Sequence, residues 1–149
     1  MKFKLLFSVL AALSVHAASP SIPADASPVG RWKTIDDHSG KPRGLVRIYE
    51  RNGEFFGRVE SSLNPLDAAE RCDLCSDDRK DQPVIGMELI RYLKKAGPDE
   101  YNNGEILDPD SGIVYRCKMR LSDQGRKLLI RGYLGFALLG RTQVWYREP

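Results

Sequence analysis

The last part of the chain decides the fold, and it reads Lys127-Leu-Leu-Ile-Arg-Gly-Tyr-Leu-Gly-Phe-Ala-Leu-Leu-Gly-Arg-Thr-Gln-Val-Trp-Tyr-Arg147. Two runs within it, residues 127–133 and 137–147, are rich in the aliphatic and aromatic residues that favour strands. The bend between them contains Gly132, Gly135 and Gly140. The pattern predicts an antiparallel strand pair with a kinked corner, which closes a barrel or a sandwich.

A tryptophan near the start of the domain offers a partner for this closing pair. Trp32 follows Gly30 and Arg31 in the first predicted strand, and the last strand carries Arg141 and Arg147. In many small ligand-binding barrels an arginine of the last strand packs over a tryptophan of the first and seals one end by a cation–π contact. Either arginine fits this role, because a one-residue bulge near Gly140 would exchange the faces they occupy. An ordinary core tryptophan with surface arginines is the alternative.

The strongest hairpin signal is Asn52-Gly53, because both residues tolerate the positive φ angles of a type I′ turn. The turn sets the register of residues 45–51 against residues 54–60 and places Ile48 opposite Gly57. One face of this hairpin is largely apolar, so we expect it to face a core.

Residues 113–121 alternate between two faces. One face carries Ile113, Tyr115, Cys117, Met119 and Leu121. About eight such strands with short turns and no internal repeat follow one another along the chain. Their number and spacing predict an all-β domain, which we assign to a single antiparallel barrel of about eight strands.

The N-terminus has the pattern of a secretory signal peptide. Lys2 and Lys4 precede an apolar run that is too short to span a bilayer. We therefore expect residues 1–17 to be a signal peptide, residues 18–28 a flexible linker, and residues 29–149 the barrel domain, in the periplasm or secreted. Loss of the two lysines leaves a nearly neutral chain, so the composition does not indicate nucleic-acid binding.

Three cysteines suggest either a redox pair, a partial metal site or a disulfide with one thiol left over. Asp73 lies between Cys72 and Cys75 and would raise a thiol pKa, whereas redox sites lower it. We predict a structural Cys72–Cys75 disulfide that pins the irregular segment 61–82, with Cys117 buried. Pairing of Cys117 with either loop cysteine is the alternative. The mature chain keeps one histidine, His38, so we expect no metal site.

Basic residues gather on the polar face of residues 113–121 and on the strand expected beside it. They are Arg116, Lys118, Arg120, Arg126, Lys127 and Arg131. This stripe could contact anionic lipid headgroups or another polyanion, although an ordinary solvated face explains it as well and the near-neutral total charge favours that explanation.

Several segments together resemble a family of small exported bacterial proteins known as domain of unknown function two-one-four-seven. They are Gly30-Arg-Trp-Lys-Thr, Pro83-Val-Ile-Gly-Met, Gly104-Glu-Ile-Leu-Asp-Pro-Asp-Ser-Gly-Ile-Val-Tyr-Arg-Cys-Lys118, Arg131-Gly-Tyr-Leu-Gly and Leu139-Gly-Arg-Thr-Gln-Val-Trp145. The resemblance implies export and, by looser analogy, a lipocalin-like barrel. It brings no catalytic residues and no cofactor.

The leading hypothesis is a protein that holds a small, partly apolar or amphipathic molecule in the barrel. Its inward wall would include Ile48, Phe55, Tyr115 and Met119, with the segment 61–82 as a lid. The alternative is a structural or interaction module of the cell envelope with a filled barrel, able to touch a membrane surface without inserting. No catalytic motif is present, so an enzyme that uses the cysteine loop ranks third.

Overall fold

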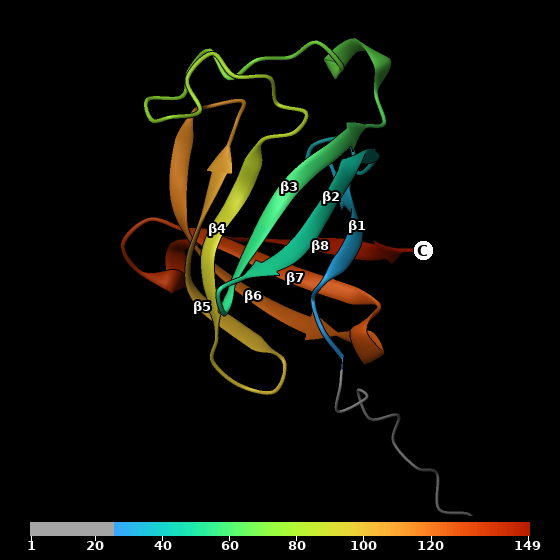
Figure 1. Cartoon of the computed structure of the whole chain (residues 1–149), viewed down its shortest axis with the longest axis vertical. Helices are drawn as coiled ribbons and strands as arrows, with labels where there is room; N and C mark the ends of the chain where they lie inside the picture. The colour runs from blue at the N-terminus through green and yellow to red at the C-terminus, as the bar shows by residue number, and fades with distance from the viewer. Residues whose placement is uncertain (1–25) are drawn as a thin grey trace, which may run out of the picture.

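The structure is a computed structural model that describes residues 26–149. The expected signal peptide, and residues 18–25 of the expected linker, lie outside the described residues. Eight antiparallel strands form one closed barrel, in which each strand pairs with the next and β8 pairs with β1 (Figure 1). The strands are β1 (Gly30–Ile35), β2 (Pro42–Arg51), β3 (Glu54–Ser62), β4 (Glu88–Lys95), β5 (Glu100–Asp108), β6 (Ile113–Ser122), β7 (Lys127–Tyr133) and β8 (Arg141–Glu148). The predicted fold class is confirmed.

The hairpin of β2 and β3 has the predicted register, with Ile48 opposite Gly57. Asn52 and Gly53 both have positive φ, 54° and 78°, as a type I′ turn requires. The pairing shifts only near Leu45, where a bulge precedes Val46. A two-residue turn with the correct residues therefore sets this register locally.

The closing pair is shorter than the sequence pattern suggested. β8 begins at Arg141, and the single-turn helix η3 (Ala137–Leu139) occupies the start of the segment expected to be strand. A Cβ atom at Gly140 would lie 2.4 Å from the carbonyl oxygen of Gly132, so the chain turns back against β7 here. The turn therefore ends at Gly140, and β8 begins to pair with β7 only at Arg141.

Two other boundaries differ from expectation. The strand expected from Pro83 begins at Glu88, because Gly86 takes a φ of +91° and turns the preceding residues onto the barrel. The expected interruption at residues 102–104 is a bulge within β5, where the pairing shifts between Tyr101 and Gly104. The remaining single-turn helices are η1 (Pro65–Asp67) and η2 (Asp123–Gly125). No helix within residues 26–149 is long and apolar enough to cross a membrane.

One end of the barrel is sealed around Trp32, whose side chain is fully buried. Its indole nitrogen donates to the carbonyl of Pro28 at 2.8 Å, and the Arg147 guanidinium lies 4.3 Å from the centre of its ring. The same guanidinium donates to three backbone carbonyls, those of Ser27, Val29 and Gly125. A Cβ at Gly30, whose φ is +139°, would lie 2.8 Å from Arg147, so glycine leaves room for the arginine. Arg147 therefore provides the cation–π seal.

Arg141 lies at the other end of the barrel, where it forms an ion pair with Asp37. The pairing of β7 with β8 runs without a register shift from residue 127 to residue 132, so no bulge exchanges the faces of the two arginines. Five residues of regular strand lie between them, which places one at each end.

Candidate ligand-binding cavity

A cavity of about 670 Å³ occupies the half of the barrel opposite the Trp32 seal. All eight strands contribute to its wall, together with the segment between β3 and β4 that crosses one end of the barrel in Figure 1. The volume falls within the range of about 300–1,000 Å³ that is usual for small-molecule sites.

The floor of the cavity is apolar. Its buried residues are Val46, Val59, Ile130 and Trp145, and the half-buried Leu89 and Ile106 pack against the same core. These mostly aliphatic side chains lie between the cavity and the aromatic rings that fill the sealed half of the barrel. A ligand resting on this floor would contact hydrocarbon on most of its surface.

A short polar chain leads from the floor to the mouth. The indole nitrogen of Trp145 donates to the side-chain oxygen Oε1 of Gln143 at 3.0 Å. The side-chain nitrogen of Gln143 donates to the Asp37 carboxylate at 2.6 Å. Asp37 in turn pairs with Arg141. All four residues line the cavity, so one side of the wall offers a hydrogen-bonding track between apolar surfaces.

The mouth carries more carboxylates than cations. The acidic residues that line it are Asp36, Asp37, Asp67, Glu70, Asp108 and Asp110, whereas the basic ones are His38, Arg43 and Arg141. Arg43 forms two hydrogen bonds with the Asp110 carboxylate, at 2.8 and 2.6 Å. The hydrogen bonds that Ser39 donates hold the pKa of Asp36 below its ordinary value.

Glu70 is the exception among these carboxylates. No group within residues 26–149 donates a hydrogen bond or forms an ion pair with its side chain, while each of the others has a partner. Partial burial raises the pKa of Glu70, and the nearby negative charge of Asp110 raises it further, against the opposing attraction of Arg43. The mouth thus presents one unneutralised acid beside the cavity.

The profile of a family described as "Uncharacterized protein conserved in bacteria" (DUF2147) matches residues 30–147. The chain belongs to this family. The match begins at the first residue of β1 and ends at Arg147, one residue before the end of β8, which confirms the resemblance seen in the sequence. No curated protein matches the DUF2147 chain.

A solved structure shows the same fold. It is protein HP1028 from the human pathogen Helicobacter pylori, described as belonging to the lipocalin family. It superposes on the DUF2147 chain with a TM-score of 0.74 and 21% sequence identity, over 83% of this chain and 84% of the other. At this identity the likeness establishes the fold alone, which is a lipocalin-like barrel.

Only one of the four residues proposed from the sequence as cavity wall lines the cavity of the DUF2147 barrel. Tyr115 does, whereas Ile48, Phe55 and Met119 pack in the sealed half, where the Phe55 and Tyr101 rings meet edge-to-face at 4.8 Å. All four face inward, as the alternation indicated. Alternation gives the face of a strand but not the height along it, so the expected wall needs this correction.

The cavity-lining residues that the sequence analysis missed could have been found from their position along each strand, measured from the sealed end. Gly30 pairs with Ile48, so the Asn52-Gly53 turn lies at the same end as Trp32. Inward residues close to that turn must therefore lie in the sealed half. Inward residues at the opposite strand ends, such as Ile106 and Gln143, must line any open half.

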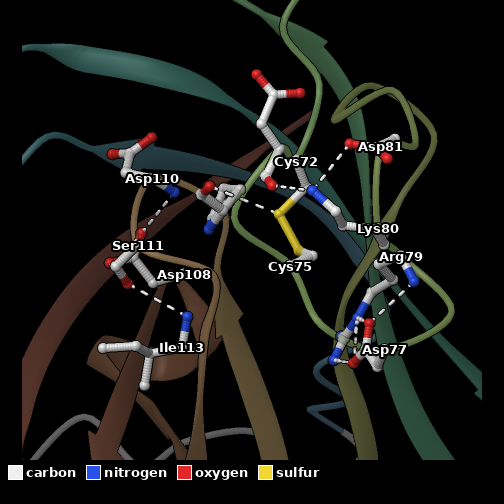
Figure 2. Close-up of a disulfide and its surroundings, with 12 residues drawn as sticks. Cys72, Cys75, Asp77, Arg79, Lys80, Asp81, Asp108, Asp110, Ser111 and Ile113 are labelled. Carbon is white, nitrogen blue, oxygen red and sulfur yellow. Dashed lines mark hydrogen bonds and ion pairs between the residues drawn. A yellow bond between two sulfur atoms is a disulfide. The ribbon is translucent and has the colours of Figure 1, made fainter.

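The segment between β3 and β4 carries the predicted Cys72–Cys75 disulfide, which is confirmed with a Cα–Cα distance of 5.4 Å (Figure 2). The backbone of Cys72 bonds to Asp81 and Gln82 and folds the segment on itself. A Cβ at Gly112 would lie 2.1 Å from the Leu74 carbonyl, so the turn between β5 and β6 packs directly against the disulfide loop.

Charged side chains fasten this segment to the barrel wall. Arg79 is only 2% exposed, lies within ion-pair distance of Asp77 and Glu105, and donates to the Glu88 carbonyl at 3.0 Å. Figure 2 shows Arg79 and Asp77 side by side below the disulfide. Val84 and Ile85 then line the cavity. The segment we expected as a lid is thus a braced part of the wall.

The third cysteine, Cys117, is a free thiol with no exposed surface, and burial raises its pKa to about 12. A thiol of this pKa is not a nucleophile near neutral pH. Within residues 26–149 no group of three or more histidine, cysteine or acidic residues is arranged to hold a metal ion.

Proposed function

We propose that the protein binds a small molecule with an apolar body and a polar end inside the barrel. The observation that carries this proposal is the cavity of about 670 Å³ with an aliphatic floor and a polar mouth at one end. Closed eight-stranded barrels either fill with side chains or hold one small ligand. The cavity favours the second state over a filled barrel that acts as an envelope module.

The charges at the mouth limit which polar end group the ligand can carry. An anionic head would meet six carboxylates and two arginines, so it would be repelled on balance. A neutral or cationic head is favoured, and Glu70 is its nearest unpaired acceptor. A disulfide persists in oxidising compartments, which supports our proposal that binding takes place in the periplasm or outside the cell.

The decisive experiment is native mass spectrometry of the protein purified from its producing bacterium, compared with the same sample after denaturation. A discrete mass lost on denaturation is expected and would identify the ligand class. A bare protein that also fails to take up a fluorescent apolar probe would overturn the proposal.

A pair of variants tests the position of the site. Ile85 lines the cavity on a loop, so Ile85→Glu places a carboxylate on the wall without altering a strand. We expect it to weaken probe binding by about tenfold or more, because an unpaired charge resists burial under a ligand. Ile113→Glu is the matched control, since Ile113 is exposed and does not line the cavity. Equal losses in both variants would contradict the assigned site.

A further inference from the structure

The loop between β7 and β8 exposes four large apolar side chains. We call Leu134, Phe136, Leu138 and Leu139 the apolar tip; they are 57%, 77%, 92% and 81% exposed. In Figure 1 this loop, which contains η3, projects sideways from the ends of its strands. Side chains of this size are rarely left so exposed together without a partner.

The tip is held in place. Gly135 takes a φ of +71°, and Gly140 packs against the backbone of Gly132, as described above. The Arg131 guanidinium donates to the Ala137 carbonyl at 2.6 Å and to the Thr142 hydroxyl at 2.9 Å. The loop is therefore tied to β7 at Ala137 and at Gly140, and its apolar side chains are exposed on a fixed turn.

Cations without carboxylate partners adjoin the tip on the outer face of β6 and β7. Lys118 is opposite Arg131 across the two strands, and Arg116 is opposite Tyr133, the residue just before the loop. The Lys118 ammonium lies 6.0 Å from the centre of the Tyr133 ring. Among the described residues, no carboxylate lies within ion-pair distance of Arg116, Lys118 or Arg131. Their positive charges are therefore not neutralised by neighbouring side chains.

We propose that the apolar tip and these three cations dock the protein on a membrane surface that carries anionic lipid headgroups. Apolar side chains beside lysine and arginine are the combination that binds such surfaces, because the former enter the headgroup boundary and the latter attract the headgroups. Side chains protruding singly from a turn suit a fluid bilayer, whereas a protein partner would need a matching pocket for each one.

The orientation follows from where the charges lie. Among the mouth carboxylates, Asp37 is neutralised by Arg141 and Asp110 by Arg43. Asp36 and Asp108 accept hydrogen bonds from Ser39 and Ser111. Asp67 and Glu70 belong to the β3–β4 segment, which lies opposite the β7–β8 loop in the closed strand order. The barrel would thus rest on its β6–β7 side. Leu134 and Leu139 also line the cavity mouth, so docking brings the mouth next to the lipid.

Sedimentation with lipid vesicles tests this inference on the full protein. We expect binding to vesicles of phosphatidylcholine mixed with phosphatidylglycerol, weaker binding to phosphatidylcholine alone, and a loss with added salt. Phe136→Ser with Leu138→Ser should lower the partition coefficient by about tenfold or more, because each loses most of its apolar surface. Arg116→Gln with Lys118→Gln should lower it by about tenfold and reduce the salt dependence.

Two control variants keep the test specific. Leu66→Ser removes a side chain that is 89% exposed on η1, among acidic neighbours, and Arg126→Gln removes an exposed cation at the sealed end. Both should leave partition within about twofold of the parent protein. No binding to anionic vesicles, or equal losses in variants and controls, would overturn the inference. A concentration-dependent dimer that Leu138→Ser abolishes would assign the tip to a second copy instead.

Docking on a membrane does not depend on the proposed ligand. Vesicle binding needs no occupied cavity, and the mass measurement of a bound ligand needs no membrane. A bare cavity with intact vesicle binding would remove the carrier function and leave the docking surface. A bound ligand without vesicle binding would do the reverse.

Discussion

The two ends of the barrel are built from the same alternating strands, yet one is packed solid and the other is hollow. At the sealed end the inward residues are large, as with Trp32, Phe55 and Tyr101. At the open end most of them are smaller, as with Val46 and Val59, although Tyr115 and Trp145 also face the cavity. The cavity therefore arises from the distribution of side-chain size along the strands, since a barrel of this strand number can fill or hold a ligand.

The ends also differ in how they are fastened. Around Trp32 the hydrogen bonds join segments that are far apart in the sequence, since the Arg147 guanidinium donates to three backbone carbonyls of the segments that meet there. The open end is crossed by a long segment whose own apolar cluster is small, consisting of Cys72, Cys75 and Met87 packed with Leu107. A disulfide and the buried Arg79 hold that segment. Packing stabilises one end, whereas a covalent bond and charge pairs stabilise the other.

The largest effect is expected from Trp32→Ala. The ring is fully buried, and its loss should lower the free energy of unfolding by about 3–5 kcal/mol. Trp145→Ala should cost less, because its ring already faces the cavity on one side. Urea unfolding measures both. An equal or greater loss for Trp145→Ala would mean that the two halves are packed to the same density, contrary to the comparison above.

The sequence predicts those features of the two barrel ends that short local motifs determine, and it does not predict those that depend on position along a strand. The Asn52-Gly53 turn fixes its register locally, and the pairing of Ile48 with Gly57 follows from four or five residues. The choice between Arg141 and Arg147 does not, because it depends on whether β8 contains a bulge. Alternation alone does not give the height of Phe55 or Met119, since it repeats every two residues at any height; only the closeness of Phe55 to the Asn52-Gly53 turn would have placed it in the sealed half.

The exposed tip also escaped prediction, for a different reason. Residues 137–139 are Ala-Leu-Leu, and an apolar run that leads directly into the strand formers of residues 142–146 looks like the start of a buried strand. The segment forms an exposed turn instead, because Gly140 packs closely against the backbone of Gly132. This is a tertiary contact that no local sequence pattern predicts. The Cys72–Cys75 pair was predictable because aspartates surround it and the two cysteines are close in sequence.

The second prediction concerns the fastening of the open end. Cys72→Ser with Cys75→Ser should lower the free energy of unfolding by about 2 kcal/mol, because the closed loop is short and constrains the unfolded chain only modestly. The loss should come with faster hydrogen exchange in residues 70–85 and unchanged exchange around Trp32. Exchange that rises equally at both ends would show that the segment is not a separate unit.

A thiol count gives an independent control for that prediction. The unfolded, non-reduced parent protein should show one reactive thiol, from Cys117. Three reactive thiols would mean that the pair is reduced in the protein as isolated, and the double serine variant would then have little effect.

The smallest effect, and the one most specific to the open end, is a pH dependence of ligand binding from Glu70. Its pKa lies above the ordinary 4.5, so it gains a proton as pH falls through that raised value. A probe with a cationic head should therefore bind several-fold more weakly below that pKa, because the unpaired negative charge is lost. Glu70→Gln should bind at the weaker level throughout and lose most of the pH dependence. Fluorescence titration of the probe from pH 7 to pH 4 measures this.

Two other acids at the mouth do not mimic this behaviour, and His38, which also lines the mouth, is removed from the comparison by titrating both proteins in a His38→Gln background. Asp110 is paired with Arg43, and hydrogen bonds lower the pKa of Asp36, so Asp36 titrates below the range that Glu70 covers. A probe with a neutral head is the matched control, since its affinity should change little as Glu70 gains a proton. If the cationic and neutral probes respond to pH alike, the mouth does not select charge, and the ligand is held by the apolar floor alone.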